Sequence, residues 1–258
     1  MPLLGFGVYK MHGKEAETAI ETAIKTGYRL IDTAAAYGNE KQVGNAIRSS
    51  GINRNHLFVT TKVENKDQGY DSTLKAFDES MKRLNIEYID LYLIHWPIKG
   101  KREETWKALE KLYSEKRVRG IGVSNYLLPF LTELAGNSNT LPLVNQLEFS
   151  PFLYLKDELN YCRTHRIQLQ SYSPLTRTKK FDHPGLLSLA KKYGKTPAQI
   201  ILRWNIQLGV SVIPKSAHPE RIRENFNIFD FSISPEDMKT VESFDEGFRV
   251  VESPMGMF

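Results

Sequence analysis

The chain has 258 residues, of which 41% are hydrophobic and 25% charged, as in an ordinary water-soluble globular protein. Its formal net charge of +5 comes from basic residues interleaved with acidic ones, so we expect no nucleic-acid partner. No apolar run approaches the roughly 20 residues of a membrane span, and the N-terminus does not resemble a signal peptide. Cys162 is the single cysteine, which excludes an internal disulfide and favours the cytoplasm.

Short apolar segments alternate with helical patterns from one end of the chain to the other. In the first half, four predicted strands cover Leu4–Val8, Leu30–Asp32, Leu57–Lys62 and Ile89–Trp96. Helices are predicted over Glu15–Thr26, Glu40–Ser49 and Thr105–Glu115. A further helix carries Leu74, Phe77, Met81 and Leu84 on one face.

The second half continues the pattern with predicted strands at Val118–Val123, Leu143–Leu147, Ile167–Tyr172 and Val210–Ile213. Two helical segments separate the last two strands, and the second begins with Thr196 as N-cap and Pro197. A final helix begins at Ser234–Pro235, with Asp237 placed to complete a capping box. Eight strand–helix alternations predict a single α/β domain over residues 1–258, a (β/α)8 TIM barrel, with an open doubly wound sheet as the alternative.

Polar residues follow the strands at the points where the strands end. A parallel barrel gathers the carboxyl ends of its strands at one mouth, where barrel enzymes place their active sites. Tyr37 follows the second strand by five residues, on the loop before the next helix. The strand-end residues are Asp32, Lys62, His95, Ser124, Asn125, Gln146, Tyr172, Ser173, Lys215 and Ser216.

Asp, Tyr, Lys and His side chains together match the needs of carbonyl reduction. Hydride addition leaves negative charge on the carbonyl oxygen, so a proton donor and a group that holds this oxygen are required. We expect the ammonium of Lys62 to lower the pKa of the Tyr37 phenol, and Asp32 to keep that lysine charged. His95 could hydrogen-bond the substrate oxygen. Taken singly, each residue has an ordinary structural explanation.

Other chemistries have weaker signals. The sequence lacks a GxSxG nucleophile elbow, and Cys162 falls inside a predicted helix. Its six histidines show no metal-ligand spacing, so we expect no metal. Gly5-Phe6-Gly7 and Gly120-Ile121-Gly122 each lack the third glycine of the dinucleotide fingerprint. A nicotinamide cofactor would therefore bind outside a Rossmann fold.

Nine segments in order resemble the aldo-keto reductase superfamily, over about Leu3 to Asp245. The closest patterns are the short-loop members similar to prostaglandin F synthase and 2,5-diketogluconate reductase. The segments are GFGVYK, GYRLIDTAAAYGNE, LFVTTK, YIDLYLIHWP, IGVSN, VNQLEFSP, SYSPL, IPKS and RIRENFNIFDF.

The resemblance implies a role for each matching residue. The catalytic tetrad would be Asp32, Tyr37, Lys62 and His95, with Tyr37 as the proton donor. The cofactor NADPH or NADP would contact Gly7, Val8, Asp32, Ser173 and Leu175. Its nicotinamide would be held by Ser124, Asn125, Gln146 and Tyr172, its 2′-phosphate by Lys215, Ser216 and Arg221, and its adenine would lie near Glu224 and Asn225. The substrate would meet Tyr9, Trp96, His95 and the tail from Phe248 to Phe258.

Three positions depart from the family pattern. Only Met1 and Pro2 precede Leu3, where the family usually has a short hairpin that closes the barrel floor. Glu64 stands where many relatives carry a pocket tryptophan, which predicts a more polar site. Ser150 replaces a common histidine before Pro151, with no consequence that the sequence reveals.

The sequence thus predicts a monomeric, cytoplasmic NADPH-dependent reductase that acts on small aldehydes and ketones. Two alternatives stay open. The chain could be an NADPH-binding regulatory or structural module on the same fold. It could also be a cofactor-free barrel hydrolase or lyase that uses Asp32 and His95 as an acid/base pair.

Overall fold

Eight short parallel strands form the centre of the computed structural model, which describes residues 1–138 and 140–257. Each strand pairs with the next in chain order. The chain closes the ring between β8 and β1, because Gly5 N donates to Val212 O at 2.8 Å and Val212 N to Leu3 O at 2.7 Å. The strands are β1 Phe6–Gly7, β2 Leu30–Asp32, β3 Phe58–Val63, β4 Leu91–Ile94, β5 Ile121–Ser124, β6 Val144–Glu148, β7 Gln168–Tyr172 and β8 Ser211–Val212. The predicted (β/α)8 barrel is confirmed, and the open doubly wound sheet is wrong.

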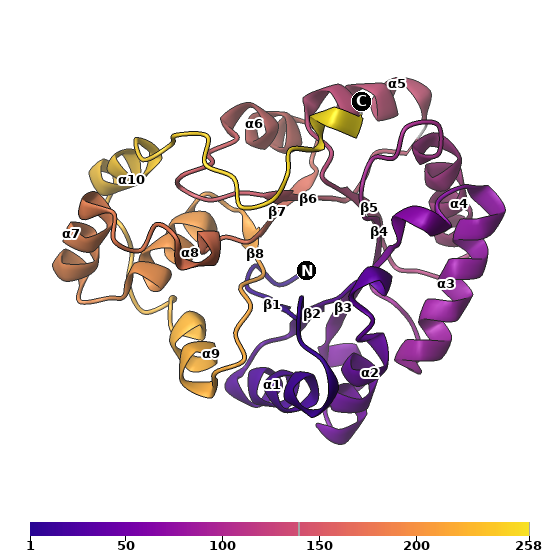
Figure 1. Cartoon of the computed structure of the whole chain (residues 1–258), viewed down its shortest axis with the longest axis horizontal. Helices are drawn as coiled ribbons and strands as arrows, with labels where there is room; N and C mark the ends of the chain where they lie inside the picture. The colour runs from indigo at the N-terminus through magenta and orange to yellow at the C-terminus, as the bar shows by residue number, and fades with distance from the viewer. Residues whose placement is uncertain (139, 258) are drawn as a thin grey trace.

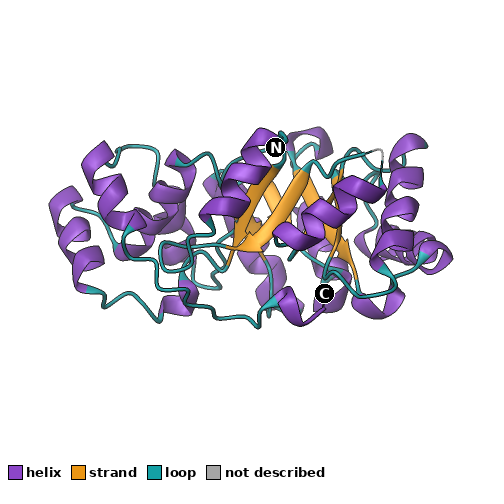
Figure 2. Ribbon diagram, turned by 90° about the horizontal axis from the view of Figure 1, so that it is seen from above, coloured by secondary structure: helices purple, strands orange, loops and turns teal. Residues whose placement is uncertain are grey.

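Helices surround the strands on the outside of the ring (Figure 1), and Figure 2 shows the strands side-on within the helical layer. The helices are α1 Gly13–Thr26, α2 Glu40–Ser49, α3 Tyr70–Leu84, α4 Arg102–Ser114, α5 Leu128–Asn137, α6 Lys156–Thr164, α7 Pro184–Tyr193, α8 Pro197–Gln207, α9 Pro219–Phe226 and α10 Pro235–Glu242. The sequence yielded no residue bounds for α5 and α6, although a helix was expected around Cys162. Cys162 lies within α6, as expected, and is fully buried.

Helix starts follow the capping residues in the sequence. At α8, the Thr196 side chain accepts from Gln199 N, while the Gln199 side chain accepts from Thr196 N, a reciprocal capping box. At α10, the Ser234 hydroxyl accepts from Asp237 N, as predicted. The carboxylate of Asp237 does not complete that box, because it pairs instead with Lys192 and Tyr193 of α7.

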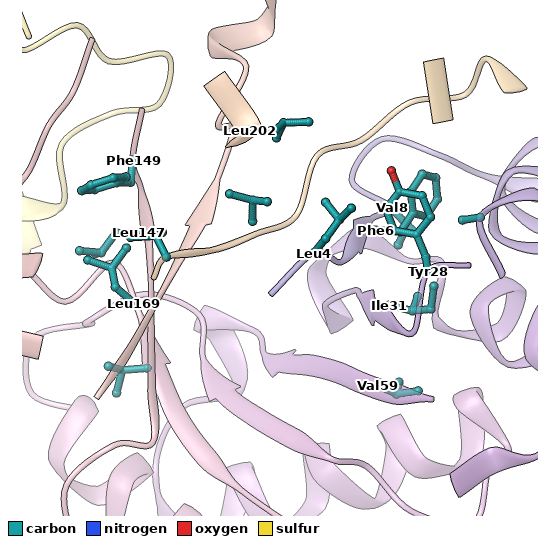
Figure 3. Close-up of a cluster of buried hydrophobic side chains, with 14 of the residues drawn as sticks. Leu4, Phe6, Val8, Tyr28, Ile31, Val59, Leu147, Phe149, Leu169 and Leu202 are labelled. Carbon is teal, nitrogen blue, oxygen red and sulfur yellow. The ribbon is translucent and has the colours of Figure 1, made fainter. Parts of the chain in front are cut away.

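Side chains along each strand alternate between two apolar regions: the layer between the strands and the helices, and the inside of the barrel. Ile31 and Val59 point outward and pack with the helices in the main hydrophobic core, part of which Figure 3 shows. Leu91, Leu93 and Val144 form a separate small apolar cluster, with Phe58 packed against it. Above this cluster, toward the carboxyl ends of the strands, the inward positions become polar. This change in chemistry marks where the site lies.

Candidate active site

Asp32 and Lys62 form a buried ion pair at the carboxyl end of β2 and β3. The two strands are paired in register, with Asp32 beside Thr60, so that Lys62 projects inward one step nearer the mouth. Lys62 Nζ lies 2.7 Å from Asp32 Oδ1 and also donates to Thr33 O at 2.8 Å. Lys62 is 0% and Asp32 2% exposed. Such a buried lysine needs a partner because an isolated charge in the interior is costly.

Tyr37 lies over this ion pair, on the short 3₁₀ helix Ala35–Tyr37 between β2 and α2. Gly38 ends that turn in the left-handed conformation, with φ of 65°, which glycine adopts at no steric cost. The Tyr37 ring centroid is 5.2 Å from Lys62 Nζ and 5.7 Å from the ring of His95, in an edge-on arrangement. The ring of Tyr9 lies 5.0 Å away on the other side. The structure therefore brings all four predicted tetrad residues together.

The β1–α1 loop that carries Tyr9 is fixed to this cluster by Asn39. The buried Asn39 amide donates to Val8 O at 2.8 Å and to Met11 O at 2.9 Å, and its oxygen accepts from Thr33 Oγ1 at 2.7 Å. The bonds to Val8 and Met11 join segments that are 31 and 28 residues apart in the sequence, whereas the bond from Thr33 is local.

Burial dominates the protonation of the site. Burial, followed by the negative charge of Asp32, raises the pKa of Tyr37 well above its ordinary value. Burial also lowers the pKa of Lys62, although Asp32 opposes this shift. The pKa of His95 falls to about 3, first because of burial and second because of Lys62. The expected lowering of the Tyr37 pKa by Lys62 is not observed: Tyr37 is a neutral phenol and His95 a neutral imidazole at pH 7.

A row of hydrogen-bonded polar side chains continues from Asp32 across the barrel interior. Gln146 Nε2 donates to Asp32 Oδ2 at 2.8 Å and to Gln170 Oε1 at 2.7 Å, and Gln170 Nε2 donates to Ser211 Oγ at 3.2 Å. We call Lys62, Asp32, Gln146, Gln170 and Ser211 the polar belt. Sequence reasoning missed Gln170 and Ser211, although both lie at inward positions of predicted strands.

Above the tetrad opens a cavity of about 640 Å³, within the roughly 300–1,000 Å³ usual for small-molecule sites. Its lining includes most of the predicted residues: Gly7, Val8, Tyr9, Asp32, Tyr37, His95, Trp96, Ser124, Asn125, Gln146, Tyr172, Ser173, Leu175 and Lys215. Sequence reasoning missed Lys10, Ala36, Pro174, Arg177, Thr178, Ile213 and Pro214. Of these, Arg177 and Thr178 closely follow the SYSPL motif, a signal that was available.

One wall of the cavity presents amide, hydroxyl and aromatic groups. The Tyr172 hydroxyl donates to Asn125 Oδ1 at 2.8 Å, and Asn125 Nδ2 donates to His95 O at 2.9 Å. Asn125 is held with φ of 67°, a strained conformation for a residue other than glycine. Ser124 Oγ donates to Gln146 O at 3.0 Å. This set suits a planar ring with an amide substituent, because it offers an aromatic face and fixed polar partners.

The loop after β7 is unusual in its backbone. Ser173, Thr176, Arg177 and Thr178 all have positive φ, between 48° and 65°. Arg177 and Lys215 place two cations on the cavity lining, which suits an anionic ligand. Together with the amide and aromatic wall, these cations fit a dinucleotide phosphate.

Four predicted cofactor residues lie outside the cavity lining. Ser216 is buried before α9, whereas Arg221, Glu224 and Asn225 belong to α9. Arg221 is exposed, Asn225 is buried, and Glu224 accepts a hydrogen bond from Thr196 Oγ1 at 2.7 Å. Of these four residues, only Ser216 directly follows a lining residue, Lys215, and none of the four lines the cavity itself.

Two of the three departures from the family pattern, Glu64 and Ser150, make local contacts in the structure. Glu64 is absent from the cavity lining and pairs with Lys66 at 3.0 Å, so the expected polar contribution to the pocket is not seen. Ser150 Oγ accepts from Phe152 N at 3.2 Å and stabilises the turn after β6. Of the predicted substrate-side tail, Val251 lines the cavity, Phe248 packs beside Lys180, and Phe258 lies outside the described residues.

The described part of the chain holds no group of three His, Cys, Asp or Glu side chains arranged for a metal ion. Burial raises the pKa of the Cys162 thiol to about 12, which leaves it unreactive as a nucleophile at neutral pH. Among the described helices, none is both long and apolar enough to cross a bilayer.

Comparison with known proteins agrees with the geometry. A sequence model of the Aldo/keto reductase family matches residues 3–246. The chain is 49% identical over 255 residues to glyoxal reductase of Bacillus subtilis, covering 98% of this chain and 92% of that protein. It is 44% identical to the crystal structure of an aldo-keto reductase enzyme from a Medee basin deep-sea metagenome library, with a TM-score of 0.95 and coverage of 98% and 94%.

A third relative was solved with a nucleotide. An aldo-keto reductase of Bombyx mori, in complex with NADP, is 34% identical, with a TM-score of 0.91 and coverage of 98% of this chain and 92% of that one. These matches confirm the predicted superfamily and the oxidoreductase class. The chain belongs to the aldo/keto reductase family.

Proposed function

We propose that this protein is an NADPH-dependent reductase of aldehydes and ketones, with Tyr37 as the general acid. The observation that carries the proposal is the position of Tyr37. Its ring lies 5.2 Å from the Lys62 ammonium and 5.7 Å from the His95 ring, on the wall of the cavity. A carbonyl oxygen placed against this wall would meet a proton donor and a hydrogen-bond donor together.

Three side chains of the protein would control the transfer of the proton to the substrate oxygen. Because its pKa is raised by burial, Tyr37 holds its proton at neutral pH until the substrate oxygen gains negative charge. The Lys62 ammonium, kept in place by Asp32, then stabilises the phenolate that remains. Neutral His95 can donate one N–H to the same oxygen, and it cannot supply a second proton at pH 7.

NADPH, when bound, supplies the hydride. We infer that Ser124, Asn125 and Gln146 hold its carboxamide, and that Tyr172 lies against its ring. Both N–H groups of Gln146 are already committed, to Asp32 and Gln170, so its carbonyl oxygen is left to accept from the carboxamide. The other contacts proposed for NADPH are Gly7, Val8, Ser173, Leu175, Lys215, Ser216, Arg221, Glu224 and Asn225.

Two comparisons support the ligands. The Bombyx mori relative was solved with NADP, which supports the nucleotide. The Bacillus subtilis relative is named glyoxal reductase, so small dicarbonyl compounds are the first substrates to test. We propose Tyr9, Trp96 and His95 as the substrate-side residues, since all three line the cavity.

The test measures the loss of NADPH absorbance with glyoxal and a panel of simple aldehydes. Tyr37→Phe should lower kcat by about two orders of magnitude or more, the usual contribution of a general acid. NADPH should still quench tryptophan fluorescence in that variant, because the phenol is not assigned to cofactor binding. Tyr113→Phe is the matched control, since it removes the hydroxyl of an exposed tyrosine outside the cavity lining and should keep full activity. Equal turnover by Tyr37→Phe and the unaltered enzyme would refute the role of Tyr37.

The two alternatives make different predictions in the same assay. A purely regulatory or structural NADPH-binding module would show quenching without turnover. A cofactor-free hydrolase or lyase would show no quenching, and the structure disfavours it because both oxygens of Asp32 already accept hydrogen bonds. We also propose that the enzyme is a monomer in the cytoplasm that binds no nucleic acid. Size-exclusion chromatography with light scattering would test the first of these.

A further inference from the structure

The segment after α10 lies along one side of the barrel mouth (Figure 1). We call residues 245–257 the C-terminal tail. It runs from α10 past β7 and β6 toward α5, as the yellow end of the chain in Figure 1 shows. Its first half is anchored on the outside of the mouth, because Phe248 N donates to Phe152 O at 2.8 Å and Lys180 pairs with Glu246. Lys180 Nζ also lies 4.4 Å from the Phe248 ring centroid.

A single buried carboxylate holds the next part of the tail. Glu148, the last residue of β6, is 3% exposed. Its Oε1 accepts from Val250 N at 2.6 Å, and its Oε2 accepts from Val251 N at 3.1 Å. Two successive backbone amides, 102 and 103 residues away in the sequence, therefore share one carboxylate. Such a group is stable in the interior only when its oxygens are hydrogen-bonded, so the tail and Glu148 depend on each other.

This contact places the tail at the reaction site. Val251 lines the same cavity as Tyr37, His95 and Trp96. The register of β6 and β7 puts Glu148 directly beside Tyr172. Glu148 therefore lies between the tail on one side and the aromatic wall of the cavity on the other. The mechanism described above does not use it.

We propose that Glu148 is a positioning residue that fixes Val250 and Val251 as one wall of the substrate pocket, and so selects carbonyl compounds by size. This inference rests on the proposed reductase function. A bulky aldehyde would contact this wall, whereas a three-carbon aldehyde is too short to depend on it. Loss of the contact should therefore affect large substrates and leave hydride transfer itself unchanged.

The kinetic test compares Glu148→Gln with the unaltered enzyme, at saturating NADPH, on propanal and on 4-nitrobenzaldehyde. Glutamine replaces one carboxylate oxygen with an NH2 donor, so in this geometry one of the two tail amides would face a donor instead of an acceptor. We expect KM for 4-nitrobenzaldehyde to rise about fivefold or more, while kcat and KM for propanal change less than about twofold. Glu252→Gln is the matched control, because it neutralises an exposed carboxylate of the same tail that takes no part in the anchoring contacts described above, and it should change neither substrate.

Hydrogen exchange of the complex with NADPH gives a second readout. In the unaltered protein the amides of Val250 and Val251 should be protected, and in Glu148→Gln they should exchange roughly tenfold faster, as expected for a lost charge-assisted bond. Rapid exchange of both amides in the unaltered protein would overturn the proposal without any variant. Should Glu148→Gln not fold, Val251→Ala tests the wall directly, and unchanged KM for both aldehydes would also overturn it.

Measuring the affinity for NADPH distinguishes the positioning of the tail by Glu148 from an effect of Glu148 on cofactor binding. Because Glu148 lies beside Tyr172, its replacement could act on the nicotinamide site instead of the tail. Equal losses on both aldehydes, together with weaker NADPH binding and protected tail amides, would assign Glu148 to the cofactor wall and refute the proposal. Failure of the unaltered enzyme to reduce propanal would refute the reductase function itself, a different result from any of these.

Discussion

Gln146 Nε2 donates to Asp32 Oδ2 at 2.8 Å, while Lys62 Nζ holds Asp32 Oδ1 at 2.7 Å. Each oxygen of the carboxylate thus has its own fixed partner, one from β3 and one from β6. Within the polar belt, Asp32 connects the proposed catalytic Lys62 to the remaining members, and the belt ends at Ser211 on β8. Such a connected set holds its members in place before substrate arrives, which is the condition for electrostatic stabilisation without rearrangement.

The buried ion pair predicts a strong coupling between its two members. Lys62→Met should leave Asp32 as a buried carboxylate without its cation and destabilise the protein by about 3–5 kcal/mol. Asp32→Asn should likewise leave Lys62 unpaired. The double variant should lose clearly less than the sum of the two single losses, as urea denaturation can measure. Strictly additive losses would contradict the pairing. Lys82→Met, which removes an exposed partner of Glu79, is the control and should change stability little.

The polar belt predicts that Gln170 supports the site from a distance. Gln170→Leu removes the acceptor for Gln146 and the donor to Ser211, so we expect a stability loss of about 1–3 kcal/mol. It should also lower kcat/KM several-fold, because Gln146 and Asp32 lose a neighbour that orients them. Gln168→Leu is the matched control on the same strand, since Gln168 bonds Gly209 O away from the mouth. It should cost stability without changing the kinetics; equal kinetic effects of the two variants would refute the role of the belt.

Much of this site could be predicted because its residues follow strand ends. Once the eight strands are recognised, the closure of a parallel barrel brings Asp32, Lys62 and His95 to one mouth. The position of Tyr37 could be predicted as well, because it follows Asp32 by only five residues and must therefore lie near the carboxyl end of β2.

What the sequence could not reveal depends on distant partners and on burial. Glu148 directly follows the predicted strand Leu143–Leu147, and its role was not predicted, because its partners are the backbone amides of Val250 and Val251 and a backbone amide has no sequence signature. The protonation of Tyr37 was expected in the wrong direction. The lysine charge can be read from the sequence, whereas the desolvation that outweighs it is a property of the folded site.

The protonation states predict a broad pH profile. Because the pKa of His95 is about 3 and that of Tyr37 lies well above its ordinary value, neither group changes charge near neutrality. We expect kcat/KM for glyoxal to be nearly flat from about pH 6 to about pH 9, without an inflection near the ordinary histidine pKa of about 6.5. An inflection there that disappears in His95→Gln would contradict the neutral imidazole.

The lowered pKa of His95 predicts how the free energy of unfolding changes as the pH falls. The unfolded chain takes up a proton on His95 as the pH falls below about 6.5, whereas the folded protein does not until about pH 3. The unfolded state therefore binds more protons in this interval, and stability should fall as the pH decreases through it. Urea denaturation at pH 7 and pH 5 measures the loss. It should be smaller in His95→Gln, which has no proton to bind, and an equal loss in that variant would assign the effect to other groups.

Arg221 predicts the choice between NADPH and NADH. It is an exposed residue in the first half of α9, close in sequence to Lys215 at the cavity edge, and we propose that it binds the 2′-phosphate that only NADPH carries. Arg221→Ala should raise KM for NADPH about tenfold, equivalent to about 1.4 kcal/mol of binding, and leave KM for NADH unchanged.

Arg223→Ala is the matched control, since it removes an exposed arginine from the same helix with the same change of charge. If both variants weaken NADPH binding equally, and added salt removes the difference from the unaltered enzyme, the helix attracts the nucleotide only through its general positive charge. If Arg221→Ala weakens NADPH and NADH alike, the guanidinium binds a part that the two nucleotides share, and the basis of the cofactor preference must lie with Lys215 and Ser216.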